Sequence, residues 1–228
     1  MEKAMHSQFY KSMEEQNLSR ELTFAFLNTP GLYSETESYI MACQNGVYGS
    51  LVYRKIVMIQ PLQDTRCRAL LYYYLRHIHG IDEEKNPAYP YPPGDIPAVV
   101  QNENVKIFWN FPFSPTAEIT AYKPDMVVLH RQTENVFVIE MSCPSERNIQ
   151  SKKLKNTFIL FRLKHTYPGY KSIIFIPLII GVCGVMKPTV TDGVRKLNFD
   201  TATTRSIVHQ MQKYVVLGLS YVVIRWNA

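Results

Sequence analysis

The sequence lacks the cysteine patterns on which disulfide-rich and zinc-bound proteins are built. It contains four cysteines, Cys43, Cys67, Cys143 and Cys183, and no two of them form a CxxC pair. Such scattered spacing is typical of reduced thiols, so we expect a nuclear or cytoplasmic protein rather than a secreted one. Cys67 is near His77 and His79 in the chain, but three ligands are one short of a structural tetrahedral site. No zinc is therefore expected.

Apolar runs long enough to span a membrane are also missing. Ile173–Met186 is interrupted by Pro177 and two glycines, and Tyr214–Trp226 contains Arg225. Because a spanning helix needs about 20 apolar residues, both runs are expected to be core elements, and no membrane segment is expected. Met1–Gln16 is polar and carries charges of both signs, which predicts no secretory signal.

The residues that are present suffice for one substantial domain, since 46% of the 228 are hydrophobic. The formal net charge of +6 is a modest basic excess, which is compatible with a polyanionic partner without requiring one. Five prolines fall within residues 80–97, where they exclude regular structure. We therefore expect a helical segment over residues 1–79, a proline-rich linker over 80–96, and a domain over 97–228 that ends in a helix.

Hydrophobic periodicity predicts helices before the linker and alternating strands and helices after it. Before the linker, the expected helices lie within Met1–Phe26, over Glu35–Ile59 as one helix or two, and over Asp64–His79. After it, we expect strands over Val105–Phe111, Met126–Leu129, Val136–Ile139 and Tyr170–Gly181, the last buried on both faces, and helices over Asn148–Lys164 and Thr203–Ile224. Within the first of these two helices, Thr157–Phe161 also fits a strand. The order of elements predicts an α/β fold.

Two acids flank the expected hairpin at positions that antiparallel pairing brings together. Asp125 precedes the first strand, Glu140 follows the second, and the polar stretch His130–Asn135 has the length of a hairpin loop. Because the start of one strand lies beside the end of the next, we expect the two carboxylates to meet. Such a pair can hold a hard divalent cation such as Mg²⁺. Acids at strand ends are also commonly solvated, so spacing alone leaves both interpretations open.

A basic stretch follows the hairpin and contains no acid. A metal-dependent nuclease usually has a lysine near its acids. In a strand, the residue two positions after Glu140 lies on the same face, and this chain has Ser142 there. A lysine from the next helix is the alternative source. The candidates are basic residues between positions 147 and 164, namely Arg147, Lys152, Lys153, Lys155, Arg162 and Lys164. They predict either a solvated basic face or contacts to phosphates.

Several segments together resemble the C-terminal region of non-LTR retrotransposon polyproteins, which carry a restriction-like endonuclease after the reverse transcriptase. The similarity covers nearly the whole chain, and it is strongest around the hairpin. The segments that carry it are HSQFYKS (6–12), ETESYIMACQN (35–45), DTRCR (64–68), ENVKIFWNFPF (103–113), KPDMVV (123–128), VIEMSCP with the following SERNI (138–149), and FIPLIIGVCG (175–184).

The resemblance implies a PD-(D/E)xK nuclease, a restriction-endonuclease-like mixed sheet flanked by helices that nicks DNA. On this basis Asp125 and Glu140 are expected to bind Mg²⁺ or Mn²⁺. Lys155 is the expected catalytic lysine, with Lys152 and Lys153 as alternatives. Lys152, Lys153 and Arg162 are expected to contact the DNA phosphate backbone.

The chain departs from the family pattern at several positions. Glu140 stands where an aspartate is usual, Leu70 replaces the second cysteine of a zinc knuckle that retains Cys67, and Asn110 replaces the acid after Trp109. There is no polymerase motif, so we expect a detached fragment or a protein derived from one. The leading hypothesis is a metal-dependent endonuclease in which catalysis has survived or decayed. The alternative is a catalytically inactive nucleic-acid-binding protein.

Overall fold

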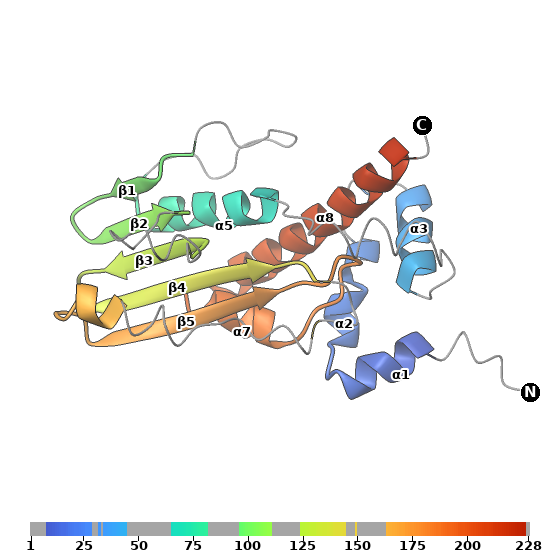
Figure 1. The fold of residues 1–228 in the computed structure, drawn as a ribbon, viewed down its shortest axis with the longest axis horizontal. Coiled ribbons are helices and arrows are strands. Elements are labelled where there is room, and N and C mark those ends of the chain that lie inside the picture. The colour runs from blue at the N-terminus through green and yellow to red at the C-terminus, as the bar shows by residue number, and fades with distance from the viewer. Residues whose placement is uncertain are drawn as a thin grey trace, which may run out of the picture.

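The protein is a mixed α/β structure organised around one five-stranded sheet (Figure 1). The computed structural model describes residues 8–28, 34–44, 65–81, 96–110, 124–144 and 163–226, together with Leu32 and Ile149. The expected α/β class is confirmed. The finer expectation, that the sheet is of the restriction-endonuclease type, stays a prediction.

The strands lie in the sheet in the order in which they occur in the chain. They are β1 (Val99–Gln101), β2 (Val105–Trp109), β3 (Met126–His130), β4 (Asn135–Ser142) and β5 (Ser172–Ile179). Neighbouring strands from β1 to β4 are antiparallel to one another, and β5 is parallel to β4. The predicted strand over 105–111, the hairpin and the strand over 170–181 are therefore confirmed.

The expectation that β5 is buried on both faces is wrong. Ile176 and Leu178 are fully buried, but Ile173 and Phe175, whose side chains alternate with these, are partly exposed. The cluster around Leu163, which packs on that face, covers Ile173 and Phe175 only in part. An apolar run in a sequence does not reveal how completely each face of its strand is covered.

The helices are α1 (Gln8–Glu15), α2 (Arg20–Thr23), the 3₁₀ helix η1 (Ala25–Asn28), α3 (Ser34–Gln44), α5 (Thr65–Ile78), α7 (Thr189–Arg195) and α8 (Thr201–Trp226). Those expected over 64–79 and 203–224 are confirmed as α5 and α8. The helix expected over 148–164 lies almost entirely outside the described residues. No helix in the described part of the chain is both long and apolar enough to cross a membrane.

Alternation along the strands creates two apolar faces. One face packs against α5, α7 and α8, through residues such as Ile107, Met126 and Ile176. The opposite face carries Val127 and Val138 among others, and it packs against Leu163 and the residues that follow it. The sheet is thus the middle layer of the core.

The segments before the expected linker share this core. Leu71 and Leu75 of α5 are fully buried in the cluster that contains the sheet residues. Further towards the N-terminus, Phe26 and Ile40 pack with Val216 of α8. Residues 82–95 lie outside the described part of the chain, so the division into segments at 80–96 stays a prediction. The helices before it nevertheless pack on the same sheet and helices as the rest.

The C-terminal end of α5 is fixed to the sheet beside the hairpin loop. Asn102 donates a hydrogen bond from Nδ2 to the main-chain oxygen of His79, at 2.7 Å. The ring of His79 contacts the ring of His130 edge to face, with 5.6 Å between centroids. Burial, and to a lesser degree the neighbouring His130, lower the pKa of His79 to about 4.

This histidine should make stability fall as the pH drops from about 6.5 towards 4. The unfolded chain takes up a proton near pH 6.5, whereas folded His79 resists protonation until about pH 4, so acid favours unfolding. Because the ring is partly exposed, we expect an effect on the order of 1 kcal/mol. Denaturant unfolding at pH 7.5 and pH 5 should show a smaller loss in His79→Phe than in wild type. An equal loss of stability in both proteins would contradict this role of His79.

Candidate functional site

Asp125 and Glu140 lie side by side at one end of the β3–β4 hairpin. The last regular pair there is Met126 with Ile139, and the next pair in the same register is Asp125 with Glu140. Residues directly opposite each other in antiparallel strands have Cβ atoms about 5 Å apart. The prediction that the two acids meet at one end of the hairpin is therefore confirmed.

The neighbouring strands extend this arrangement into a row across the sheet. Asn110, which follows β2, donates its main-chain N–H to the main-chain oxygen of Asp125 at 3.0 Å. On the other side Glu140 pairs with Pro177 of β5. Asn110 has a φ of 46°, a left-handed conformation that ends β2 at this point. The strand ends thus place the main chains of Asn110, Asp125 and Glu140 next to one another.

The carboxylate of Asp125 is buried and is held at both oxygens. Its Oδ2 accepts the main-chain N–H of Met141 at 2.7 Å. The side chain thereby continues the hydrogen bonding between the two strands beyond the start of β3. Its Oδ1 lies 2.7 Å from Nη1 of Arg68, which comes from the first turn of α5. The side chain of Asp125 is 9% exposed and that of Arg68 is 20% exposed. The acid is therefore fixed between a strand and a helix.

Burial raises the pKa of Asp125 above its ordinary value of 3.8, although Arg68 and the Met141 hydrogen bond both act to lower it. Burial thus has the largest effect on this carboxyl group. The guanidinium of Arg68 and the N–H of Met141 are the contacts that favour its charged form.

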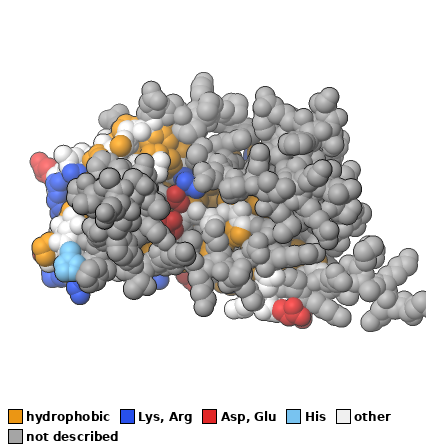
Figure 2. All heavy atoms as spheres, in the orientation of Figure 1, with side chains coloured by type: hydrophobic (Ala, Val, Ile, Leu, Met, Phe, Trp, Pro, Cys, Tyr) orange, Lys and Arg blue, Asp and Glu red, His pale blue; other side chains and the backbone are white. Residues whose placement is uncertain are grey.

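Glu140 and Arg68 approach Asp125 from different layers. Alternation puts Glu140 on the β4 face of Val138, which packs in the cluster opposite α5. Arg68 comes from α5, which covers the other face. Glu140 is half-buried. In the space-filling view an acidic and a basic side chain lie against each other near the middle of the displayed face (Figure 2).

The pair of carboxylates fits Mg²⁺ or Mn²⁺ better than a metal that needs a complete protein cage. Mg²⁺ is usually bound by one or two carboxylates, with substrate phosphates and water as the other ligands. Within the part of the chain that the structure describes, no group of three or more His, Cys, Asp or Glu residues is placed to hold a metal ion. Asp125 and Glu140 are therefore the two acids of the described residues that could share such an ion.

Cys67 and His79, the expected remnant of a zinc knuckle, are far apart. They are separated by twelve positions on α5 and its C-terminal extension, which corresponds to about 18 Å along a helix. The thiol of Cys67 is buried and donates to the main-chain oxygen of Met211 at 3.2 Å. These two residues cannot ligate the same ion.

The basic residues expected to act on DNA, Lys152, Lys153, Lys155 and Arg162, lie outside the described residues, so their roles stay predictions. Sequence reasoning missed Arg68. The signal was its spacing, because Arg68 is three and seven residues before the buried Leu71 and Leu75. A cation on the apolar face of a helix needs an acid opposite it.

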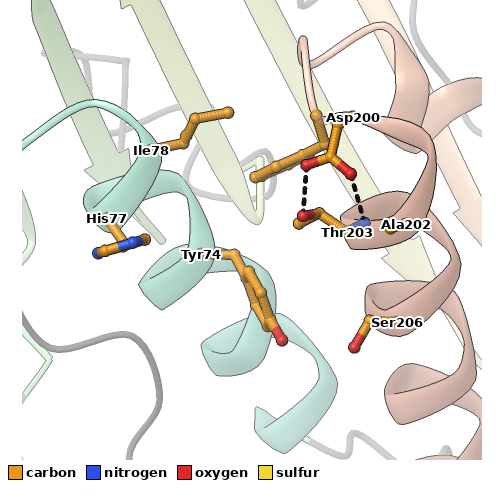
Figure 3. A pocket seen from close by; sticks show the side chains of 8 residues that line it. Tyr74, His77, Ile78, Asp200, Ala202, Thr203 and Ser206 are labelled. Atoms are coloured by element: carbon orange, nitrogen blue, oxygen red, sulfur yellow. Dashed lines mark hydrogen bonds between the residues drawn. The ribbon is translucent and has the colours of Figure 1, made fainter.

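A separate hollow of about 660 Å³ lies between the end of α5 and the start of α8 (Figure 3). Tyr74 and His77 line it from α5, Thr203 lines it from α8, and Asp200 lines it from the position just before α8. Asp200 accepts the N–H and the hydroxyl of Thr203, and these hydrogen bonds lower its pKa. The acid thus caps α8. His77 is about 13 Å along α5 from Arg68, so the hollow is distinct from the carboxylate pair.

Comparisons with known proteins add no relative to this picture. No protein-family model matches the sequence, no curated protein matches it, and no solved structure matches the fold. The functional interpretation therefore depends on the contacts of Asp125, Glu140 and Arg68, together with the sequence motifs.

Proposed function

We propose that the protein is a metal-dependent DNA endonuclease in which Asp125 and Glu140 hold Mg²⁺ or Mn²⁺. The observation that carries this proposal is the position of a buried carboxylate, paired with an arginine, directly opposite a second carboxylate at the end of two paired strands. A solvated acid at a strand end would need no such partner. The PD and IE motifs of the sequence supply the same two residues.

The chemistry would be hydrolysis of a phosphodiester bond. The divalent ion would supply Lewis-acid activation of the phosphate and of the attacking water. Asp125 and Glu140 bind and orient it from adjacent strands. Lys155, or one of its neighbours Lys152 and Lys153, would orient the water and stabilise charge on the phosphate. Lys152, Lys153 and Arg162 would hold the DNA backbone through its charge.

Glu140→Gln tests the proposal because it removes one metal ligand without changing the size of the side chain. We expect nicking of supercoiled plasmid in Mg²⁺ or Mn²⁺ to fall by at least about 100-fold, since a lost ligand costs several kcal/mol of transition-state stabilisation. The matched control is Glu134→Gln, an acid of the hairpin loop that pairs with Lys171 at the surface. The control should nick like wild type. Equal activity in both variants would contradict a catalytic role for Glu140.

A nucleic-acid-binding protein without catalysis is the second candidate. Asp125 already has a cation beside it in Arg68, and an amide, Asn110, stands in the row where the resemblance implies a third acid. Both features would suit a site that has lost its metal. Such a protein would bind DNA with an affinity that falls steeply with salt, and it would not cut in any divalent ion.

A further inference from the structure

We propose that Arg68 changes partner during the reaction. Without a divalent ion it neutralises Asp125, and with the ion bound it releases Asp125 and binds the phosphate of the DNA strand to be cut. This inference rests on the proposed endonuclease function and adds to it a residue that nothing in the motifs assigns.

The contact between Arg68 and Asp125 uses only part of the hydrogen-bonding capacity of the guanidinium group. The contact joins Nη1 of Arg68 to Oδ1 at 2.7 Å, and Oδ2 accepts the N–H of Met141. Arginine and carboxylate groups that pair for structure frequently do so through two parallel hydrogen bonds. Among the described residues, the other guanidinium N–H groups of Arg68 have no further protein partner. Since the side chain is 20% exposed, these donors can face an incoming phosphate.

The charges of the site support a change of partner. Without metal, the charges of Asp125 and Arg68 cancel each other within their contact. A divalent ion adds two positive charges beside this pair, and these attract the single negative charge of a phosphodiester. Arg68 no longer has to neutralise Asp125 in that state. Its guanidinium and a phosphate then form a charge-assisted contact.

The backbone that carries Arg68 is fixed, so the change requires only side-chain rotation. The residue before it, Cys67, is 1% exposed and hydrogen-bonded to α8. Leu70 and Leu71, on the following turn, are also buried in the core shared with the sheet. Rotamer changes of a long side chain on such a helix need no movement of the fold.

The test is the affinity for Mn²⁺ in the absence of DNA, measured by electron paramagnetic resonance of the free ion. In wild type the ion must break the Arg68–Asp125 contact, whereas in Arg68→Gln it does not. We therefore expect Arg68→Gln to bind Mn²⁺ at least about tenfold more tightly than wild type. Plasmid nicking at saturating Mn²⁺ should change in the opposite direction, falling at least about tenfold, because the phosphate contact is lost.

Two controls separate this effect from loss of charge elsewhere and from misfolding. Arg195→Gln removes an exposed arginine, which pairs with Asp192 at 3.5 Å, and it should leave both quantities unchanged. Arg68→Lys keeps the positive charge and should bind Mn²⁺ within about threefold of wild type. If Arg68→Gln does not fold, the Nε–H resonance of Arg68 in the wild-type protein should shift when Mg²⁺ is added. An unchanged resonance would overturn the proposal.

The remaining outcomes distinguish this inference from the proposed function. Equal or weaker Mn²⁺ binding by a folded Arg68→Gln, with wild type binding the ion, would overturn the role of Arg68 and leave the metal site standing. Unchanged nicking in that variant would overturn the phosphate contact. If neither protein binds Mn²⁺, the proposed endonuclease fails, and the inference fails with it.

Discussion

Asp125→Asn is expected to reduce metal-dependent nicking by at least about 1,000-fold while the protein stays folded. The amide oxygen of asparagine can still accept the N–H of Met141, which Asp125 binds at 2.7 Å. It carries no charge, however, and is a much weaker ligand for a divalent ion. Alanine would be a poorer choice, since it would leave the Met141 N–H and Arg68 without their partner. The side chain that it removes is only 9% exposed.

The nicking rate of supercoiled plasmid, with thermal unfolding followed in parallel, measures this prediction. Asp192→Asn is the matched control, because Asp192 is an exposed acid in α7 whose pair with Arg195 is at the surface. It should be as active and as stable as wild type. A folded Asp125→Asn that nicks at the wild-type rate would exclude Asp125 as a metal ligand.

Gln212→Met is expected to destabilise the fold by about 3 kcal/mol, because it removes a buried polar bridge between three segments. The Nε2 of Gln212 in α8 donates to the main-chain oxygens of Leu22, Thr23 and Gly184, at 2.7, 3.1 and 2.7 Å. Gln212 is fully buried, and methionine fills nearly the same space without a donor. The three carbonyls would lose a buried partner, and such losses cost about 1 to 3 kcal/mol each when nothing replaces them.

Differential scanning calorimetry should show a decrease in Tm of about 9 °C for Gln212→Met. The matched control is Gln210→Met, two residues earlier on the same helix. Gln210 donates to the hydroxyl oxygens of Tyr74 and Ser206 in a less buried position, so its loss should cost less than about 1 kcal/mol. Equal effects of the two variants would contradict the claim that α8 holds the N-terminal segment through Gln212.

Local patterns were sufficient to predict the hairpin and its acids. Two short runs rich in valine, separated by a polar loop, determine both strands, and antiparallel pairing then requires Asp125 to lie near Glu140. Helices α5 and α8 were predictable for the same reason, since their buried residues repeat with helical spacing. These features depend on residues that are close in sequence.

Features that depend on docking were not predictable. The contact between Arg68 and Asp125 joins a helix and a strand that the linker separates, and no local pattern pairs them. Helix α7 was missed because Gly193 disfavours a helix locally. The packing leaves little room for a side chain here, since a Cβ would lie 3.0 Å from Ile176 Cγ2 and 3.1 Å from Leu178 Cδ2. Close packing of α7 on β5 thus overrides the propensity of the sequence.

Cleavage of DNA with a divalent ion is tested most directly by plasmid nicking with the folded wild-type protein in Mg²⁺, repeated after addition of EDTA and again after excess Mg²⁺. We expect nicking in Mg²⁺, none in EDTA, and recovery when Mg²⁺ is restored. A folded protein that leaves the plasmid intact in both Mg²⁺ and Mn²⁺ would contradict it. Binding of the intact plasmid that weakens steeply with salt would then identify the noncatalytic alternative.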